Sequence, residues 1–110
     1  ELHLSYGMMG AFMQPQGHLQ LISNMVDHDM DPQQAINALR FMVGNDNVIL
    51  EEGLDPAVAR DLQSRGHKVG QITGYNRVSI GGAQMIKRDP DTGVLTGASE
   101  PRKDGCAVGY

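Results

Sequence analysis

The fold of this chain is decided by a stretch near its start, Gly7-Met8-Met9-Gly10-Ala11-Phe12-Met13-Gln14-Pro15-Gln16-Gly17-His18-Leu19-Gln20. Its glycines can adopt backbone angles that other residues avoid, which predicts a sharp turn at Gly7 after a short strand over residues 2–6. Pro15 suits the first position of a helix, because its φ is already helical and it has no N–H to leave unpaired. The apolar residues that follow have the spacing of one buried face of a helix ending near residue 28. They are Leu19, Ile22, Met25 and Val26.

A small-residue turn that leads into a helix has two interpretations. It can aim backbone N–H groups at a developing negative charge, because the start of a helix carries the positive end of the helix dipole. It can also be a tight turn that only precedes a buried helix. On residue spacing alone, the second and purely structural interpretation is favoured.

The composition excludes several classes of partner. The chain has 110 residues, of which 40% are hydrophobic and 20% charged, as in an ordinary globular domain. Thirteen acidic and nine basic residues give a net charge of −4, with no cluster of Lys and Arg, so we expect neither nucleic acid nor an anionic membrane as a partner. With a single cysteine, no internal disulfide is expected, and the compartment, cytoplasm or periplasm, stays open.

Two further helix starts share one local pattern. In Asp31-Pro32 and Asp55-Pro56 the aspartate caps the helix and the proline takes its first position. Gln34 adds the reciprocal partner of a capping box in the first of them. We expect that helix to reach Gly44 at the latest and the other to stop at Gly66. Their predicted buried residues are Ala35, Ile36, Ala38 and Leu39 in the first helix and Val58, Ala59 and Leu62 in the second.

Strand patterns fill the rest of the chain. Short apolar or extended segments predict strands over residues 48–50 and 69–72, and the longest alternation predicts a strand over residues 77–87. The alternation slips at Gly81-Gly82, as a bulge or a close backbone approach would cause. The turn Asp89-Pro90-Asp91-Thr92-Gly93 then returns the chain in a hairpin over residues 77–97. Helices followed by antiparallel strands predict the α+β class.

No complete active site is visible in these residues. Cys106 has no histidine near it in sequence and is expected to be a partly buried, unreactive thiol. His28 stands between Asp27 and Asp29, but neighbouring helical side chains diverge and cannot share one ion. No serine lies in a G-x-S-x-G context. We therefore expect no cofactor and no metal site.

Both ends of the chain carry specific motifs. The opening stretch quoted above resembles the segment G-x-x-G-G-x-x-Q-P-Q-x-H-L-Q of γ-glutamyltranspeptidase-like proteins. The closing Glu100-Pro101-Arg102-x-Asp104-Gly105-x-Ala107-x-Gly109-Tyr110 is similar to the terminus D-P-R-x-D-G-x-A-x-G-Y of that family. Further resemblances between them are Met30-Asp31-Pro32-Gln33-Gln34-Ala35, Arg65-Gly66-His67 and Gly81-Gly82-Ala83-Gln84. They occur in the family's order and span essentially the whole chain.

The resemblance implies an N-terminal-nucleophile (Ntn) hydrolase with a four-layer αββα sandwich. Residues 1–110 would be a single domain or fragment, the C-terminal portion of the small subunit. In that family a precursor cleaves itself, and the new N-terminal threonine of the small subunit attacks a γ-glutamyl amide to give an acyl-enzyme. The implied partners are the large subunit, the N-terminal part of the small subunit, and a γ-glutamyl or other small amide substrate.

The resemblance also implies the site residues. The family's glycine pair, whose backbone N–H groups form the oxyanion hole, aligns with Gly10 and Ala11. Alanine can take this place where its backbone angles are reachable, because the donors belong to the backbone. No threonine precedes Thr73, so the nucleophile is missing and the isolated chain is expected to be inactive.

Two other interpretations stay open. The Gln14-Pro15-Gln16 insert points to an amidohydrolase-like branch, so the substrate can be a small amide other than a γ-glutamyl compound, as for an amidohydrolase or acylase. The second alternative is a non-catalytic module that forms homo-oligomers, because unpaired strand edges favour pairing with another copy.

Overall fold

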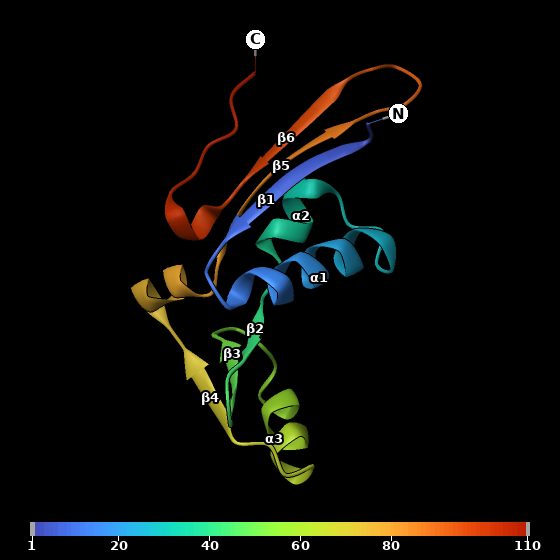
Figure 1. Ribbon diagram of the computed structural model, residues 1–110. Helices are drawn as coiled ribbons and strands as arrows, with labels where there is room; N and C mark the ends of the chain where they lie inside the picture. The colour runs from blue at the N-terminus through green and yellow to red at the C-terminus, as the bar shows by residue number, and fades with distance from the viewer. Residues whose placement is uncertain (1, 110) are drawn as a thin grey trace.

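A computed structural model describes residues 2–109 as an elongated molecule of 48 × 27 × 23 Å that contains two small sheets. The first sheet has the strand order β1-β5-β6 and the second β2-β3-β4. The two sheets lie one beyond the other along the molecule, each with its own helices (Figure 1). The predicted α+β class is confirmed.

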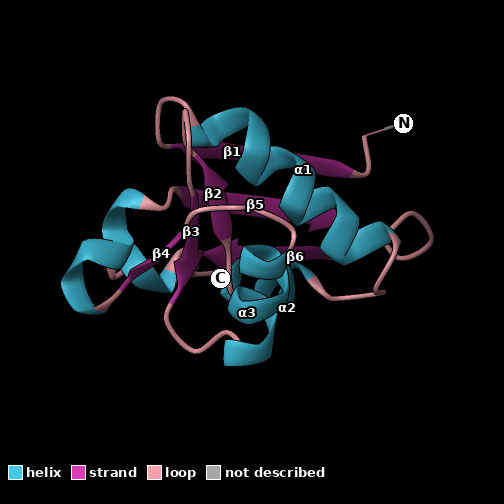
Figure 2. Cartoon of the chain, turned by 90° about the horizontal axis from the view of Figure 1, so that it is seen from below, coloured by secondary structure: helices cyan, strands magenta, loops and turns pink. Residues whose placement is uncertain are grey.

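The first sheet and two helices form the main core. In this sheet β1 (Leu4–Met9), β5 (Gly82–Arg88) and β6 (Leu95–Ser99) are antiparallel, and Met9 lies opposite Gly82. The helices α1 (Met13–Val26) and α2 (Pro32–Asn37) cover one face of the sheet (Figure 2). The buried cluster between them consists of Met8, Leu21, Ala35, Ile36, Ala83, Met85 and Ala98.

Two predictions about the first helix were wrong. It begins at Met13, two residues before Pro15, and its buried residues are Met13, Gly17 and Leu21. Leu19 and Val26, which were expected to be inside, are 71% and 70% exposed. The physical reason is close contact with β1, because a Cβ atom on Gly17 would overlap the sulfur of Met8. The small residue, more than the apolar spacing, selects the face that packs.

The second sheet is a βαβ unit with one additional strand. Its strands β3 (Val48–Glu51) and β4 (Val69–Ile72) and the helix between them, α3 (Pro56–Ser64), lie where the sequence predicted a strand, an extended segment and a helix. The parallel pairing of the strands was not predicted, and the expected buried face of α3 was wrong, since none of its residues is buried and Val58 is 42% exposed. The third strand, β2 (Phe41–Val43), was not predicted. The helix expected to extend toward Gly44 ends at Asn37, and the expected core residue Leu39 is 39% exposed.

The strand predicted over residues 77–87 begins later than expected. Residues Gly74–Ser79 form a 3₁₀ helix, η1, and β5 starts only at Gly82. The close backbone approach predicted at Gly81-Gly82 is confirmed, since a Cβ atom on Gly10 would lie 3.1 Å from Cα of Gly81. The hairpin turn is also confirmed: the Oδ1 atom of Asp89 accepts a 2.7 Å bond from the N–H of Thr92. A second 3₁₀ helix, η2 (Pro101–Lys103), follows β6.

The capping box at Asp31 is confirmed and leads to a stability prediction. The N–H of Gln34 donates to Oδ1 of Asp31 at 2.8 Å, and the side chain of Gln34 accepts from the N–H of Asp31 at 3.0 Å. Asp31→Ala removes the cap and is expected to lower the free energy of unfolding by about 1 kcal/mol. Asp31→Asn keeps an acceptor oxygen and should cost less than half as much in the same urea titration. Equal losses in the two variants would contradict the capping role.

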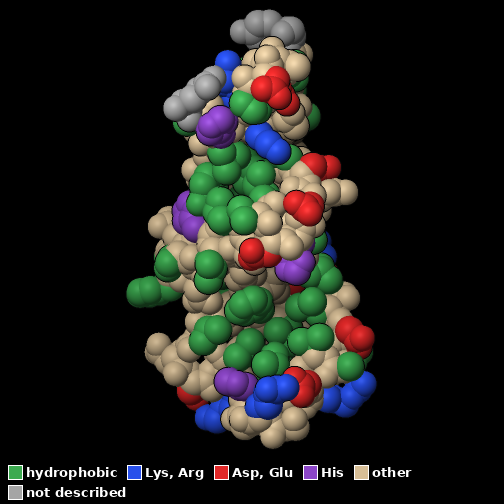
Figure 3. All heavy atoms as spheres, turned by 90° about the vertical axis from the view of Figure 1, so that its right-hand side faces the viewer, with side chains coloured by type: hydrophobic (Ala, Val, Ile, Leu, Met, Phe, Trp, Pro, Cys, Tyr) green, Lys and Arg blue, Asp and Glu red, His purple; other side chains and the backbone are tan. Residues whose placement is uncertain are grey.

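Apolar side chains are also abundant on the surface. On the face that Figure 3 shows, hydrophobic side chains gather in two patches. The exposed apolar residues include Phe12, at 90%, and Leu19, Val26, Phe41 and Val43. Within residues 2–109, no helix has both the length and the apolar character needed to cross a membrane.

Candidate functional site

The turn between β1 and α1 is where the structure places both residues of the predicted oxyanion hole. The turn predicted at Gly7 was wrong, because the strand continues to Met9. Gly10 (φ 139°) and Ala11 (φ 49°) then reverse the chain. The carbonyl of Gly10 accepts from the N–H of Met13 at 2.8 Å, and that of Ala11 accepts from the N–H of Gln14 at 3.0 Å.

Ala11 holds a backbone angle that glycine normally supplies. It is the first central residue of the turn closed between Gly10 and Met13, and a positive φ costs a residue with a Cβ atom about 1–2 kcal/mol. The next residue, Phe12, lies in the right-handed region (φ −63°, ψ −15°). A positive φ followed by a right-handed residue is a tight-turn pattern in which glycine is favoured at the first central position.

The N–H groups of Gly10 and Ala11 have no acceptor in the part of the chain that the structure describes. Gly10 is half-buried and Ala11 is exposed, so a ligand can reach both. The 14-residue helix α1 starts directly behind them, with no side-chain cap and no acidic residue in its first turn. An oxygen that gains negative charge here would be stabilised by both the donors and the helix dipole.

Gly81 packs against this turn. Its φ is 90°, and a side chain on it would contact Met8 and Met13. The absence of a Cβ atom on Gly10 lets its backbone lie against the Cα and N atoms of Gly81. The position of the turn therefore depends on how the Gly81 peptide is held.

A buried cluster of four charged side chains lies next to Gly81. We call it the charge cluster; its members are Arg40, Glu51, Glu100 and Arg102, which are 2%, 0%, 0% and 9% exposed. Arg102 grips Glu51 with two bonds of 2.6 and 2.7 Å and Glu100 with one of 2.8 Å. Arg40 Nη2 lies 2.7 Å from Glu100 Oε2. Within these four residues, two guanidinium groups thus face two carboxylates, and the partly exposed Arg77 also approaches the cluster, with its Nε 3.7 Å from Oε1 of Glu51.

The charge cluster also binds the backbone of several elements. The guanidinium groups of Arg40 and Arg102 donate to the carbonyl of Ile36 at 3.0 and 2.9 Å, and Arg102 also reaches the carbonyl of Ala38 at 2.9 Å. Glu51 accepts from the N–H of Arg40 at 2.9 Å. These bonds join the end of α2, strand β3 and η2, and so connect the two sheets. Among residues 2–109, every buried side-chain nitrogen and oxygen has a partner.

Sequence reasoning missed this cluster. Glu100 and Arg102 were noted only as part of the closing motif. The sequence contains one indication of buried charges: Arg40 directly precedes the apolar run 41–43, and Glu51 directly follows the apolar run 48–50. A charged residue there is either solvent-exposed or paired inside, and the sequence cannot choose between these.

Opposite charges set the protonation of the charge cluster. Burial disfavours the Glu100 carboxylate, but hydrogen bonds from Arg102 and from the N–H of Ala83, with the charge of Arg40, outweigh burial and lower the pKa of Glu100. Burial likewise disfavours charged Arg102, yet its bonds to Glu51 and Glu100 raise its pKa. For Arg40 burial prevails and its pKa is lowered, although a guanidinium stays protonated at any physiological pH.

These protonation states predict a loss of stability in acid. The pKa of Glu100 is lower in the folded chain than in the unfolded chain, where it is about 4.3. Its contribution is therefore fully present above about pH 4.3 and is lost as the pH falls through the folded pKa. The difference in unfolding free energy between the wild type and Glu100→Gln should narrow as the pH falls below about 4.3 and through the lowered pKa of the folded chain. Urea titrations across this range measure it, and a constant difference would contradict the prediction.

The other sequence candidates form no site. Cys106 is exposed, so the expectation of a partly buried thiol was wrong. No group of three or more His, Cys, Asp or Glu side chains within residues 2–109 could hold a metal ion. His18 packs edge-on against Tyr6, with 5.0 Å between the ring centroids.

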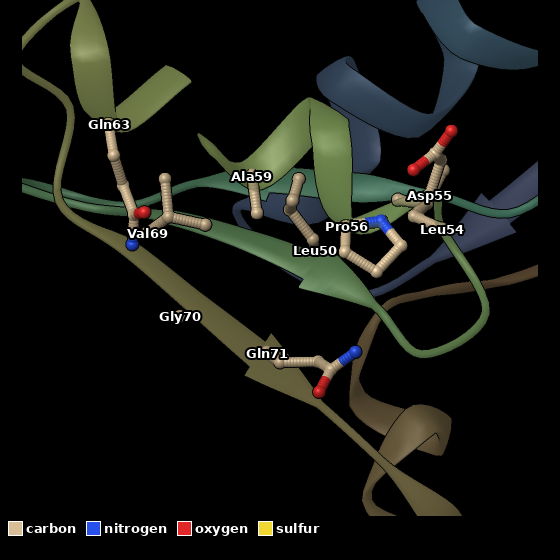
Figure 4. A pocket seen from close by; sticks show the side chains of 9 residues that line it. All are labelled: Leu50, Leu54, Asp55, Pro56, Ala59, Gln63, Val69, Gly70 and Gln71. Atoms are coloured by element: carbon tan, nitrogen blue, oxygen red, sulfur yellow. The ribbon is translucent and has the colours of Figure 1, made fainter. Parts of the chain in front are cut away.

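A pocket of about 280 Å³ lies between α3 and strands β3 and β4 (Figure 4). Its one carboxylate belongs to Asp55, which accepts from the N–H of Ala57 at 2.8 Å and so caps α3. The other lining residues are Leu50, Leu54, Pro56, Ala59, Gln63, Val69, Gly70 and Gln71. The residues that line the pocket do not combine a nucleophile with a base. The turn at Gly10 and Ala11 is therefore the better candidate for a functional site.

Comparison with known proteins finds close relatives. The model of the gamma-glutamyltranspeptidase family matches residues 1–110. The chain is 41% identical over 102 residues to the acylase ACY 1 proenzyme of Pseudomonas sp. (strain SE83), a match that covers 93% of this chain and 17% of that protein. It is 34% identical over 110 residues to the glutathione hydrolase-like YwrD proenzyme of Bacillus subtilis (strain 168), covering 94% and 21%.

A solved structure agrees with the fold. The crystal structure of cephalosporin acylase from Bacillus halodurans matches with a TM-score of 0.82 and 42% identity, over 88% of this chain and 18% of that one. The chain spans about a fifth of the length of the curated relatives it matches. Because the family model covers the whole sequence, the chain belongs to the gamma-glutamyltranspeptidase family, within the Ntn-hydrolase superfamily.

Proposed function

We propose that residues 1–110 are the C-terminal portion of the small subunit of an enzyme that cleaves γ-glutamyl amides through an acyl-enzyme. The chain supplies the oxyanion hole, formed by the backbone N–H groups of Gly10 and Ala11, and the scaffold behind it. The threonine nucleophile comes from the N-terminal part of the small subunit, and the large subunit completes the site. The proposal is carried by the two adjacent N–H groups that have no acceptor within residues 2–109, at the start of α1.

The proposed role follows from the chemistry of amide cleavage. The threonine hydroxyl gives its proton to a general base, such as the free α-amine of that N-terminal residue, as its oxygen bonds to the amide carbon. The carbonyl π electrons move onto oxygen to give a tetrahedral oxyanion, and the base later passes the proton to the leaving nitrogen. Two N–H donors at the turn stabilise that charge where it develops. When the oxyanion collapses, the C–N bond breaks and the amine leaves with a proton. Attack by water or by an amino acid then releases the acyl group and regenerates the threonine.

The acyl group is tested with a matched pair of substrates. We would assay the full proenzyme with γ-glutamyl-p-nitroanilide and with glutaryl-p-nitroanilide, which lacks only the α-amino group. Faster turnover of the first supports the γ-glutamyl assignment. Faster turnover of the second would replace it with an acylase or small-amide hydrolase, as the name of the Pseudomonas relative suggests. The isolated 110-residue chain should cleave neither, and turnover by it would contradict an external nucleophile.

The second candidate is a non-catalytic, self-associating module. Exposed apolar residues such as Phe12, Phe41 and Val43 favour it, since such side chains often mark contact surfaces. It predicts no turnover by the proenzyme and a concentration-dependent dimer in analytical ultracentrifugation. A monomeric proenzyme that cleaves either anilide excludes it.

A further inference from the structure

We propose that Arg40 is a positioning residue for the turn that contains Gly10 and Ala11. Its guanidinium is held by Glu100 and donates to the carbonyl of Gly81, and the backbone of Gly10 packs against the Cα atom of Gly81. The inference deepens the proposed function and rests on the assignment of Gly10 and Ala11. Arg40 lies between α2 and β2, 2% exposed, and does not belong to the turn itself. Its action on the turn is therefore indirect.

The ion pair between Arg40 and Glu100 holds the backbone of residues 81–83 in place. Nη1 of Arg40 donates to the carbonyl of Gly81 at 3.2 Å. Oε2 of Glu100 accepts from Nη2 of Arg40 at 2.7 Å and from the N–H of Ala83 at 3.0 Å. One ion pair thus holds the backbone on both sides of Gly82, at the point where β5 begins.

Residues 81–82 contact the turn at Gly10 and the strand residue before it. Gly82 pairs with Met9, the last residue of β1, so the segment held by the ion pair lies opposite the entry to the turn. The close approach of Gly10 to Gly81 continues this contact beyond the strand. A shift of the Gly81 peptide would therefore move the N–H groups of Gly10 and Ala11 together.

The rest of the charge cluster provides a control. Arg102 is buried in the same cluster, but its partners are Glu51, Glu100 and the carbonyls of Ile36 and Ala38. No bond connects its guanidinium to Gly81 or Ala83. Arg40→Lys and Arg102→Lys each keep the buried charge and lose the planar fork, so both should destabilise the protein. Arg102→Lys loses a bond to Glu100, but only Arg40→Lys removes the direct bond to the carbonyl of Gly81.

The experiment compares both variants in the full proenzyme. kcat and KM for γ-glutamyl-p-nitroanilide are measured well below the unfolding temperature of each variant and normalised to folded, processed enzyme. We expect Arg40→Lys to lower kcat about tenfold with KM nearly unchanged, because misplaced oxyanion donors weaken binding of the transition state more than of the substrate. Arg102→Lys should stay within about threefold of the wild type. Within a Gly10→Ala background, Arg40→Lys should cost much less than in the wild type, because both act on one turn.

Hydrogen exchange gives a readout that does not depend on the substrate. The N–H groups of Met13 and Gln14 donate to the carbonyls of Gly10 and Ala11, so their exchange reports the order of the turn. Arg40→Lys should accelerate exchange in a peptide covering residues 7–14, and Arg102→Lys should not. Equal acceleration in both variants, or none in Arg40→Lys, would overturn the inference. The kcat of Gly10→Ala separately decides whether the turn is the oxyanion hole, so the two proposals can fail independently.

Discussion

Glu100→Gln is expected to lower the free energy of unfolding by about 3–5 kcal/mol. In the wild type, the buried carboxylate of Glu100 accepts hydrogen bonds from the guanidinium groups of Arg40, at 2.7 Å, and of Arg102, at 2.8 Å. Glutamine has nearly the same volume but no charge, so the guanidinium of Arg40 would lose its hydrogen-bonded carboxylate and Arg102 would keep only Glu51. An unbalanced buried charge is costly because the interior solvates it poorly. Urea unfolding at neutral pH measures the loss.

A surface ion pair provides the comparison. Lys68 and Asp46 lie 2.9 Å apart, but their side chains are 74% and 72% exposed. Asp46→Asn should change the free energy of unfolding by less than about 1 kcal/mol, since water already solvates both charges. Similar losses in the two variants would mean that burial does not set the value of the charge cluster. A loss below about 1 kcal/mol in Glu100→Gln would have the same meaning.

Gly10→Ala is expected to lower kcat about 10²-fold or more while KM changes little. The φ of 139° is strained for any residue with a side chain, and the new Cβ atom would lie 3.1 Å from Cα of Gly81 and from Cβ of Met13. The turn must shift by a few tenths of an ångström, and the proposed oxyanion donors shift with it. Steady-state kinetics of the processed enzyme test this.

Ala11→Gly is the matched control for Gly10→Ala. Glycine accepts the φ of 49° without strain and keeps the N–H donor, so kcat should equal or slightly exceed that of the wild type. A large loss of kcat in Ala11→Gly would mean that the alanine methyl group contributes directly. An unchanged kcat in Gly10→Ala would remove the oxyanion hole from this turn.

Local rules account for the features that the sequence determined by itself. The caps at Asp31 and Asp55, the Asp89 turn and strands β3 and β4 depend on neighbouring residues, so their patterns predict them directly. The motifs at both ends identified the family, because a specific order of residues needs no tertiary information. They also pointed to Gly10 and Ala11, which the structure places together at one exposed turn, although their catalytic role stays a prediction.

Tertiary packing decided the rest, because it depends on residues far apart in the chain. Glu51 and Arg102 are separated by 51 positions, so no local pattern reveals their pairing. The buried face of α1 was set by the room that Gly17 leaves for Met8, against the more apolar stripe that contains Leu19 and Val26. Phe41–Val43 is a short apolar run that fits either the end of a helix or a strand, and its pairing with β3 decides between them. Sequence thus determined the local elements and the family, whereas the burial of charges and the support of the Gly10–Ala11 turn followed from long-range contacts.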